Sequence, residues 1–193
     1  MFDLIICLTQ ETRKDRQRAV KREFKNLGVD PEWFYAIPSI GRHESFNLSQ
    51  KAILEKFIES GKETLLCFED DMCVVNKQGL CGKKDLPDDW DVLYLGANIL
   101  GNTEKVTANL FRIENVRTTH AIAYTRKAAL KILIDFPHES SIMYDEYISN
   151  LELNRFVLNP MVCWQSPGHS DIWERQVNYN REFRESQKKL NNG

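Results

Sequence analysis

The first seventy residues alternate between short apolar runs and helical patterns, which restricts the chain to a few layered folds. Residues 3–9, DLIICLT, predict a strand, and residues 12–27 predict a helix that ends at Gly28. Further strands are expected at residues 33–37 and 65–68, with a helix between them. Alternating strands and helices are typical of an α/β fold. We therefore expect a mostly parallel central sheet flanked by helices, in a single domain.

The rest of the chain continues this pattern less regularly. Helices are expected at NLSQKAILEKFIESG, with Asn47 as N-cap, at 125–136 and at YDEYISNLEL; strands are expected at WDVLYLG, VRTTHAIAY and RFVLNPMVCWQ. Residues 76–89 predict a polar loop. We expect one domain over residues 1–173 and a polar tail over 174–193 that forms a partly frayed helix.

Composition narrows the classes of function. The chain has 193 residues, 42% of them hydrophobic and 28% charged, as in a globular protein with a real core. A net charge of −2 argues against a general polyanion binder, so no nucleic acid is expected as a partner. The apolar run Leu4–Leu8 is too short for a signal peptide or a transmembrane segment.

The five cysteines show no CxxC spacing, and Cys7, Cys67 and Cys163 lie in apolar runs. We expect reduced thiols and a cytoplasmic location.

Two segments carry an excess of basic residues. Residues 11–26 hold seven basic groups against three acids, and residues 174–193 hold five against three. The first segment could meet a phosphate and the second a membrane surface as a peripheral contact. A solvated helix face is the interpretation that we favour for both.

Three consecutive carboxylates, Glu69, Asp70 and Asp71, follow the apolar run LLCF directly. Adjacent like charges repel and raise each other's pKa, so water, a basic neighbour or a metal ion should compensate. In α/β sheets ligands collect beyond the carboxyl ends of the strands. Carboxylate oxygens suit Mg²⁺ and Mn²⁺, which keep water or phosphate as further ligands. An exposed acidic turn is the alternative, and the tripeptide alone does not decide between them.

Three other residues are candidates for the same site. His169 lies in a Pro-Gly turn, WQSPGHSDI, and a loop histidine can complete a metal site. Asp145 and Glu146 open the helix YDEYISNL. Taken alone, these two acids are explained by the helix dipole, which favours negative charge in the first turn.

The ordered segments resemble glycosyltransferase family 25, which includes lipooligosaccharide and collagen galactosyltransferases. The matching segments cover nearly the whole chain and are, in order, Leu8 with RKDR at 13–16, NLSQKAILEKFIESGKETLLCFEDD, WDVLYLG, TTHAIAYTRKAALKIL, PHESSIMYDEY, and finally Pro160, Val162, Gln165 and SDI at 170–172. The family usually has Ser-His where this chain has Ser49-Gln50.

The resemblance implies a glycosyltransferase of GT-A type that uses Mn²⁺ or Mg²⁺ and a nucleotide sugar, with UDP favoured by family habit. It implies that Asp71 holds the metal, with His169 and Glu69 as further ligands. Glu69 or Asp70 would hold the ribose or sugar of the donor.

The same resemblance places the nucleotide near the end of the first strand. Thr9 would contact it, and one of Arg13 and Arg16 would face the diphosphate or the base. The resembled family inverts anomeric configuration, which requires a carboxylate base. Asp145 is expected in that role, with Glu146 as substitute.

The acceptor would be a glycan, a lipid-linked glycan or a glycoprotein, and the transferred sugar a hexose such as galactose or glucose. Trp164, Trp173 and Tyr144 are candidates to line the acceptor side.

Other readings of the acids stay open. One is a catalytically inactive homologue that binds a sugar nucleotide. Gln50, which stands where the family usually has histidine, is consistent with that alternative. A metal-dependent phosphoesterase would need more carboxylates for two metals. A receiver-type module that binds Mg²⁺ would need its acids near the N-terminus and a distal Lys-Pro, which the chain lacks.

Overall fold

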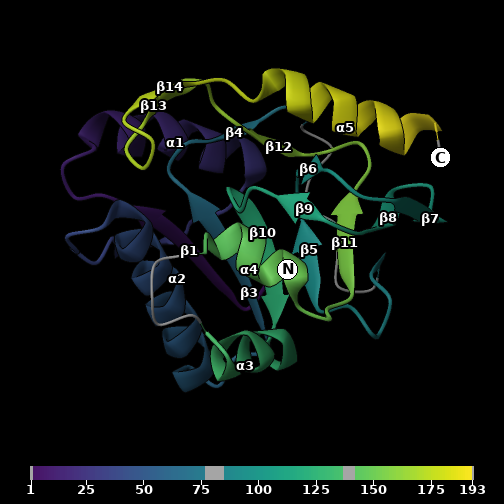
Figure 1. Cartoon of the computed structure of the whole chain (residues 1–193), viewed down its shortest axis with the longest axis horizontal. Helices are drawn as coiled ribbons and strands as arrows, with labels where there is room; N and C mark the ends of the chain where they lie inside the picture. The colour runs from purple at the N-terminus through teal and green to yellow at the C-terminus, as the bar shows by residue number, and fades with distance from the viewer. Residues whose placement is uncertain (1, 77–84, 137–141, 193) are drawn as a thin grey trace.

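The apolar runs of the sequence form the inner strands of an eight-stranded sheet (Figure 1). The computed structural model describes residues 2–76, 85–136 and 142–192. From one edge to the other, the sheet consists of β2 (Glu32–Tyr35), β1 (Leu4–Thr9), β3 (Thr64–Glu69), β10 (Ala121–Thr125), β5 (Val92–Tyr94), β11 (Arg155–Leu158), β8 (Leu110–Ile113) and β7 (Thr103–Thr107). The central strands are buried on both faces, which explains why their sequences are continuously apolar.

Six of the eight strands point the same way. Strands β2, β1 and β3 are parallel to one another, and so are β5 and β11. Strand β10 runs in the opposite direction between β3 and β5. Strand β8 also runs opposite, and β7 returns to the common direction at the edge. The expected α/β fold with a mostly parallel central sheet is confirmed.

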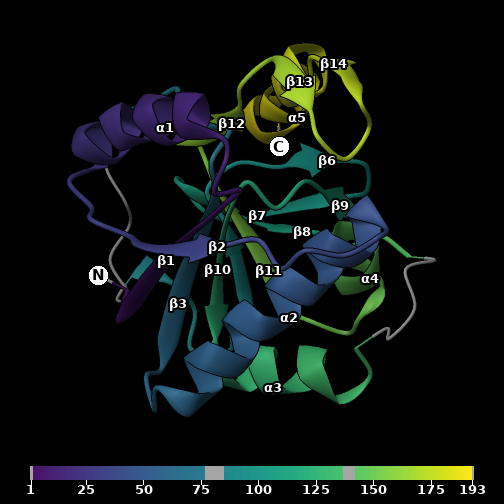
Figure 2. The same cartoon turned by 90° about the vertical axis from the view of Figure 1, so that its left-hand side faces the viewer.

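Helices cover both faces of the sheet (Figure 2). Side chains alternate along a strand, so Cys67 packs into the core on one face and Phe68 into the core on the other. On the second face the ring of Phe68 lies 5.4 Å from that of Phe24 in α1. The helices are α1 (Lys14–Leu27) on that face, and α2 (Arg42–Glu59), α3 (Arg126–Ile134) and α4 (Tyr144–Asn150) on the first.

Helix ends agree with the sequence in one case and differ in another. Helix α1 ends at Gly28 as expected, because that residue has φ +68°, a conformation that glycine adopts without strain. Helix α2, in contrast, begins at Arg42, so the prediction of Asn47 as its N-cap is wrong. Asn47 is buried inside the helix, and its amide donates a hydrogen bond to the carbonyl of Ile142 over 2.9 Å.

The second half of the chain contains short strands that the sequence did not predict. These are β6 (Asn98–Ile99) and the two strands of the hairpin β7–β8. In addition, the expected strand VRTTHAIAY is divided into two strands, β9 (Val116–Arg117) and β10. Strand β7 is largely exposed and charged, as at Glu104 and Lys105, so it lacks an apolar pattern. This strand forms because it pairs with β8, and the β-propensity of its own residues does not account for it.

Four more short strands make two small antiparallel pairs outside the main sheet. They are β4 (Met72–Val74) with β12 (Cys163–Gln165), and β13 (Gly168–Ser170) with β14 (Arg175–Val177). The second pair is a hairpin, which we call the β13–β14 hairpin. It lies beside α1 in two views (Figures 1 and 2).

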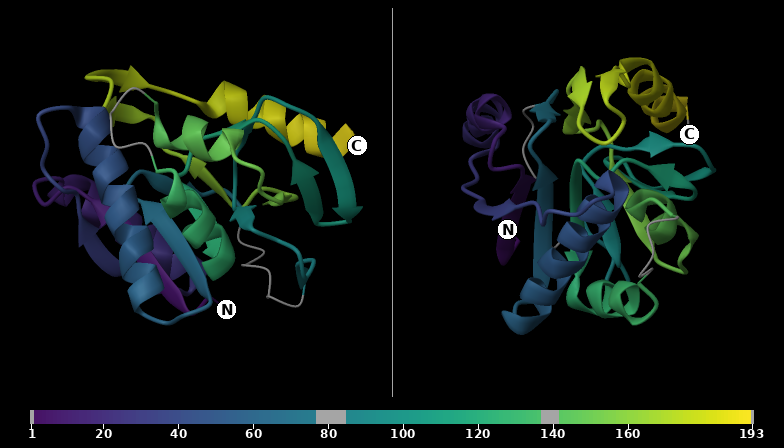
Figure 3. Two further views of the ribbon diagram at one scale, coloured as in Figure 1. Left: turned by 60° about the horizontal axis from the view of Figure 1, so that its bottom comes forward. Right: turned by 60° about the vertical axis from the view of Figure 1, so that its left-hand side comes forward.

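The C-terminal tail forms a helix, as expected, and this helix packs against the body of the protein. Helix α5 (Asn180–Asn192) buries Phe183 and Leu190, and the ring of Phe183 stacks on Trp164 at 5.7 Å. The backbone N–H of Ile99 donates to the hydroxyl of Ser186 over 2.8 Å. Figure 3 shows α5 running toward the β7–β8 edge of the sheet. The predicted division of the chain at residue 173 stays a prediction.

Some expectations fall on parts of the chain outside the described residues: Cys81, most of the loop 76–89, and residues 137–141 (PHESS), which begin the segment PHESSIMYDEY. Cys7, Cys67 and Cys163 are buried free thiols. None of the helices in the described ranges combines the length and the apolar character that a transmembrane span requires.

Candidate functional site

Two neighbouring parallel strands, β1 and β3, end side by side and bring polar residues together. Leu8 and Glu69 are partners in the ladder, so Thr9 and Asp70 follow at the same edge of the sheet. Asp70 and Asp71 form the turn from β3 into β4. This is the carboxyl edge of the parallel strands, where α/β folds bind ligands.

Asp70 is held by residues from two other elements. Its Oδ2 accepts a hydrogen bond from the Thr9 hydroxyl over 2.6 Å, and its Oδ1 accepts one from Arg16 over 2.9 Å. The residue is only 7% exposed. Burial raises the pKa of Asp70, while the hydrogen bonds from Thr9 and Arg16 act to lower it. Both oxygens of Asp70 therefore already have protein partners.

The two side-chain oxygens of Asp71 differ in their hydrogen-bond partners. Its Oδ2 accepts from the side-chain amide of Gln165 over 2.9 Å and lies 3.5 Å from Arg16. Its Oδ1 is buried and has no hydrogen-bond partner among the residues that the structure describes. Burial raises the pKa of Asp71, and the Arg16 charge acts to lower it. A buried acceptor of this kind calls for a ligand or water.

Glu69 is the last residue of β3 and precedes the two aspartates. Its Oε1 accepts a hydrogen bond from the Thr119 hydroxyl over 2.7 Å. Burial, followed by the charge of Asp71, raises the pKa of Glu69 to about 8. Glu69 therefore holds a proton more readily than an exposed glutamate does, unless a cation binds beside it.

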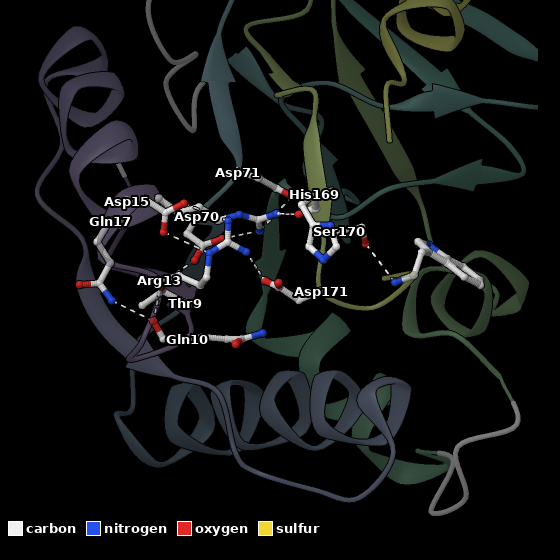
Figure 4. Close-up of polar contacts among 12 residues, drawn as sticks. Thr9, Gln10, Arg13, Asp15, Gln17, Asp70, Asp71, His169, Ser170 and Asp171 are labelled. Carbon is white, nitrogen blue, oxygen red and sulfur yellow. Dashed lines mark hydrogen bonds and ion pairs between the residues drawn. The ribbon is translucent and has the colours of Figure 1, made fainter. Parts of the chain in front are cut away.

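Two arginines from the start of α1 form ion pairs with acids of this region, and Figure 4 labels one of them, Arg13, beside Asp15 and Asp171. Arg16 contacts Asp70 and Asp71 and also donates to the backbone carbonyl of His169 over 2.6 Å. Arg13 pairs with Asp171 of the segment after β13 and with Asp15 in its own helix. Both guanidinium groups thus lie in the site, although the sequence led us to expect only one of them there.

His169 contributes its backbone to this arrangement. It lies in β13, its side chain is exposed, and its carbonyl oxygen accepts the hydrogen bond from Arg16. Across the parts of the chain that the structure describes, no group of three or more His, Cys, Asp or Glu residues is arranged to hold a metal ion. The predicted ligand set of Asp71, Glu69 and His169 is therefore not preassembled.

Asp145 lies in the first turn of α4. Its Oδ2 accepts a hydrogen bond from the backbone N–H of Thr118 over 3.1 Å, and its charge contributes to the raised pKa of Glu69. Glu146 is exposed and lies 3.7 Å from Arg117. Asp145 is thus anchored near the acids, and Glu146 points to a surface arginine.

Sequence reasoning gave no role to several residues of this site. Thr118 has φ +75°, an unusual value for a β-branched residue, and its hydroxyl is buried without a partner among the described residues. Thr119 binds Glu69, Gln165 binds Asp71, and Asp171 binds Arg13. Gln165 and Asp171 stood in the segments that carried the family resemblance, which was the available signal for them. For Thr118 there was none.

A divalent cation fits one part of this site. The unpartnered Oδ1 of Asp71 is a hard oxygen ligand, and Mg²⁺ commonly uses one or two carboxylates together with phosphate oxygens and water. The described residues thus suit a metal held by Asp71 and completed by ligands from a bound diphosphate.

No protein-family model matches the sequence, and no curated protein matches it either. Solved structures do match. The crystal structure of A197 from STIV is 12% identical, covers 92% of this chain and 93% of that chain, and has a TM-score of 0.60.

Two glycosyltransferases are among the solved structures that match with lower scores. One is involved in glycosylation of the major capsid of PBCV-1, with 12% identity, coverage of 69% of this chain and 69% of that chain, and a TM-score of 0.40. The other is a Drosophila β-1,4-galactosyltransferase 7 mutant in complex with manganese, UDP-Gal and xylobiose, with 10% identity, coverage of 96% and 79%, and a TM-score of 0.47. Identities this low show a likeness of fold alone. The α/β fold with a mostly parallel central sheet is confirmed, and its assignment to the GT-A type and to glycosyltransferase family 25 stays a prediction.

Proposed function

We propose that this protein is a metal-dependent glycosyltransferase that moves a hexose, such as galactose or glucose, from a nucleotide sugar to a hydroxyl group of a glycan. UDP is the nucleotide that we favour, following the family resemblance. The observation that carries the proposal is the buried Oδ1 of Asp71 just after β3, beside Asp70 and Arg16, which has no hydrogen-bond partner among the described residues. A buried acceptor without a donor calls for a water or a bound ligand.

Asp71 is the proposed protein ligand of the metal, and Glu69 and His169 remain proposed further ligands. A bound Mn²⁺ or Mg²⁺ would supply Lewis acidity that stabilises the charge of the leaving diphosphate. Gln165 holds the other oxygen of Asp71, so the carboxylate keeps its direction before any ligand arrives.

The donor would lie over the ends of β1 and β3. Arg13 and Arg16 would bind the diphosphate, since guanidinium groups bind phosphate oxygens in pairs. Asp70, held by Thr9 and Arg16, would accept hydrogen bonds from the ribose or sugar hydroxyls. Thr9 itself would contact the nucleotide.

Inversion requires a carboxylate that takes the proton of the acceptor hydroxyl as its oxygen attacks the anomeric carbon. At the same time, the bond from that carbon to the diphosphate breaks. We assign this base to Asp145, because the backbone of Thr118 fixes one of its oxygens and its charge acts on Glu69. Glu146 is the substitute candidate.

The acceptor class that we propose is a glycan, free, lipid-linked or on a glycoprotein. A cytoplasmic location is proposed from the free thiols of Cys7, Cys67 and Cys163, which a reducing compartment maintains.

Thermal unfolding with a panel of nucleoside diphosphates and nucleotide sugars, each with and without Mn²⁺, tests the proposal. We expect a stabilisation of a few degrees that requires both one nucleotide and the metal. Asp71→Asn should abolish it, and the matched control Asp30→Asn, at an exposed position, should keep it. No shift with any combination would contradict the proposal.

An assay of nucleotide release with glycan acceptors then separates an enzyme from an inactive homologue. Binding without turnover on any acceptor would favour the inactive sugar-nucleotide-binding protein.

A further inference from the structure

Arg16 lies between Asp70 and Asp71, at the place where a divalent metal ion would bind. Its guanidinium lies 2.9 Å from Oδ1 of Asp70 and 3.5 Å from Oδ2 of Asp71. Its side chain is only 18% exposed, so water screens this positive charge weakly. A divalent cation that approaches the unpartnered Oδ1 of Asp71 therefore meets a positive charge as well as a negative one.

Arg16 is also fixed by its other contacts. It donates to the carbonyl of His169 over 2.6 Å, so the β3–β4 turn and the β13–β14 hairpin together hold the guanidinium in place. Arg13 lies near enough for its charge to act on Arg16, and its own partners are Asp15 and Asp171. The groups that face Arg16 therefore comprise two acids, one carbonyl and one further arginine.

We propose that Arg16 makes metal binding conditional on the diphosphate: the free protein binds a divalent cation weakly, and the nucleotide diphosphate both binds Arg16 and completes the metal site. This inference rests on the proposed function and deepens it. A diphosphate carries the negative charge that Arg16 attracts and the oxygens that the cation needs. Metal and nucleotide then raise each other's affinity by the same factor, as linkage requires.

The test is the affinity of Mn²⁺ alone, measured by titration with detection of free Mn²⁺ by electron paramagnetic resonance. Arg16→Gln should bind Mn²⁺ about tenfold or more tightly than the unchanged protein without nucleotide, because one adjacent unit charge has been removed. Arg16→Lys keeps the charge and should bind Mn²⁺ as weakly as the unchanged protein. Arg18→Gln, an exposed position of the same helix, is the matched control and should change nothing.

The second arm repeats the titration with UDP present. In the unchanged protein UDP should raise the affinity for Mn²⁺ by at least about tenfold, which lies in the usual range for coupled sites. In Arg16→Gln this factor should shrink. The unchanged protein therefore tests the inference even if Arg16→Gln fails to fold.

Two results would overturn the inference: Mn²⁺ binding by the unchanged protein that is equally tight with and without UDP although UDP itself binds, or Arg16→Gln binding Mn²⁺ no more tightly than Arg18→Gln. Failure of the proposed function looks different, because then a direct titration with UDP shows no binding with or without metal. A gain of Mn²⁺ affinity in Arg16→Gln would still identify Arg16 as the competing charge.

Discussion

Thr9 and Asp70 join the ends of two neighbouring strands through one buried hydrogen bond, in which the Thr9 hydroxyl donates to Oδ2 of Asp70 over 2.6 Å. The two residues are 3% and 7% exposed, so water cannot replace the bond easily. This contact ties the first strand to the acidic turn and leaves Oδ1 of Asp70 for Arg16.

Replacing Thr9 with valine keeps the shape of the side chain and removes the donor. Asp70 would then be a buried carboxylate with Arg16 as its remaining side-chain partner among the described residues. We expect Thr9→Val to lower the free energy of unfolding by roughly 1–3 kcal/mol, the usual cost of leaving a buried polar group without its bond. Urea unfolding measures this, with Thr12→Val at an exposed position as the control. Equal stability of the two variants would show that the bond contributes nothing.

Asp145 is expected to act in the chemical step and not in donor binding. Asp145→Asn keeps an oxygen that can accept from the Thr118 N–H and removes the basic carboxylate. We expect turnover to fall by roughly 10²–10⁴-fold, the usual contribution of a general base. The affinity for UDP with Mn²⁺ should stay unchanged.

The comparison variant for Asp145→Asn is Glu146→Gln, which loses a surface contact to Arg117. If Glu146→Gln loses turnover and Asp145→Asn does not, the two roles must be exchanged. If both keep full turnover, neither residue is the base.

The sequence predicted those elements of the fold whose own residues show their burial or their turn conformation. The strands β1 and β3 are buried on both faces and therefore continuously apolar, and Gly28 marks a helix end by its positive φ. The start of α2 was missed, because its first turn is polar and the side-chain amide of the buried Asn47 donates to the carbonyl of Ile142, 95 residues away. Such a partner leaves no local signal.

In the candidate site, the acids were predictable from the sequence and their hydrogen-bond partners were not. The acids at 69–71 stand in one short run directly after a strand, so their place at the sheet edge followed from the sequence. Their partners are distant: Thr9 is 61 residues from Asp70, and Gln165 is 94 residues from Asp71. Only the order of the strands in the main sheet and the pairing of β12 with β4 bring these side chains together.

The β13–β14 hairpin is attached to the start of α1 by the ion pair between Arg13 and Asp171. We expect Asp171→Asn to speed amide hydrogen exchange across residues 168–177 by roughly two- to fivefold, the scale of a partly exposed ion pair. Hydrogen–deuterium exchange with mass spectrometry measures this. Asp15→Asn is a sharp control, because it also removes a partner of Arg13 but lies on the helix. Equal exchange in the two variants would show that the pair with Asp171 does not hold the hairpin.

His120 should make the protein less stable in mild acid. Its ring is buried against Phe183, and one nitrogen lies 3.2 Å from the carbonyl of Cys163. Burial lowers the pKa of His120 from 6.5 to about 4, so the unfolded chain binds a proton at higher pH than the folded one. The contribution of neutral His120 to stability is therefore complete above about pH 6.5 and is lost as the pH falls toward 4.

At pH 5 this loss amounts to roughly 2 kcal/mol, which urea unfolding between pH 7.5 and 5 can measure. The carboxyls of Glu69, Asp70 and Asp71 have raised pKa values, so their protonation favours the folded state in the same range and masks the effect. The His120→Gln variant isolates it, because glutamine can keep a donor near Cys163 and does not titrate. The stability difference between the unchanged protein and His120→Gln should shift by roughly 2 kcal/mol across this range, and a constant difference would show that His120 does not titrate as its burial requires.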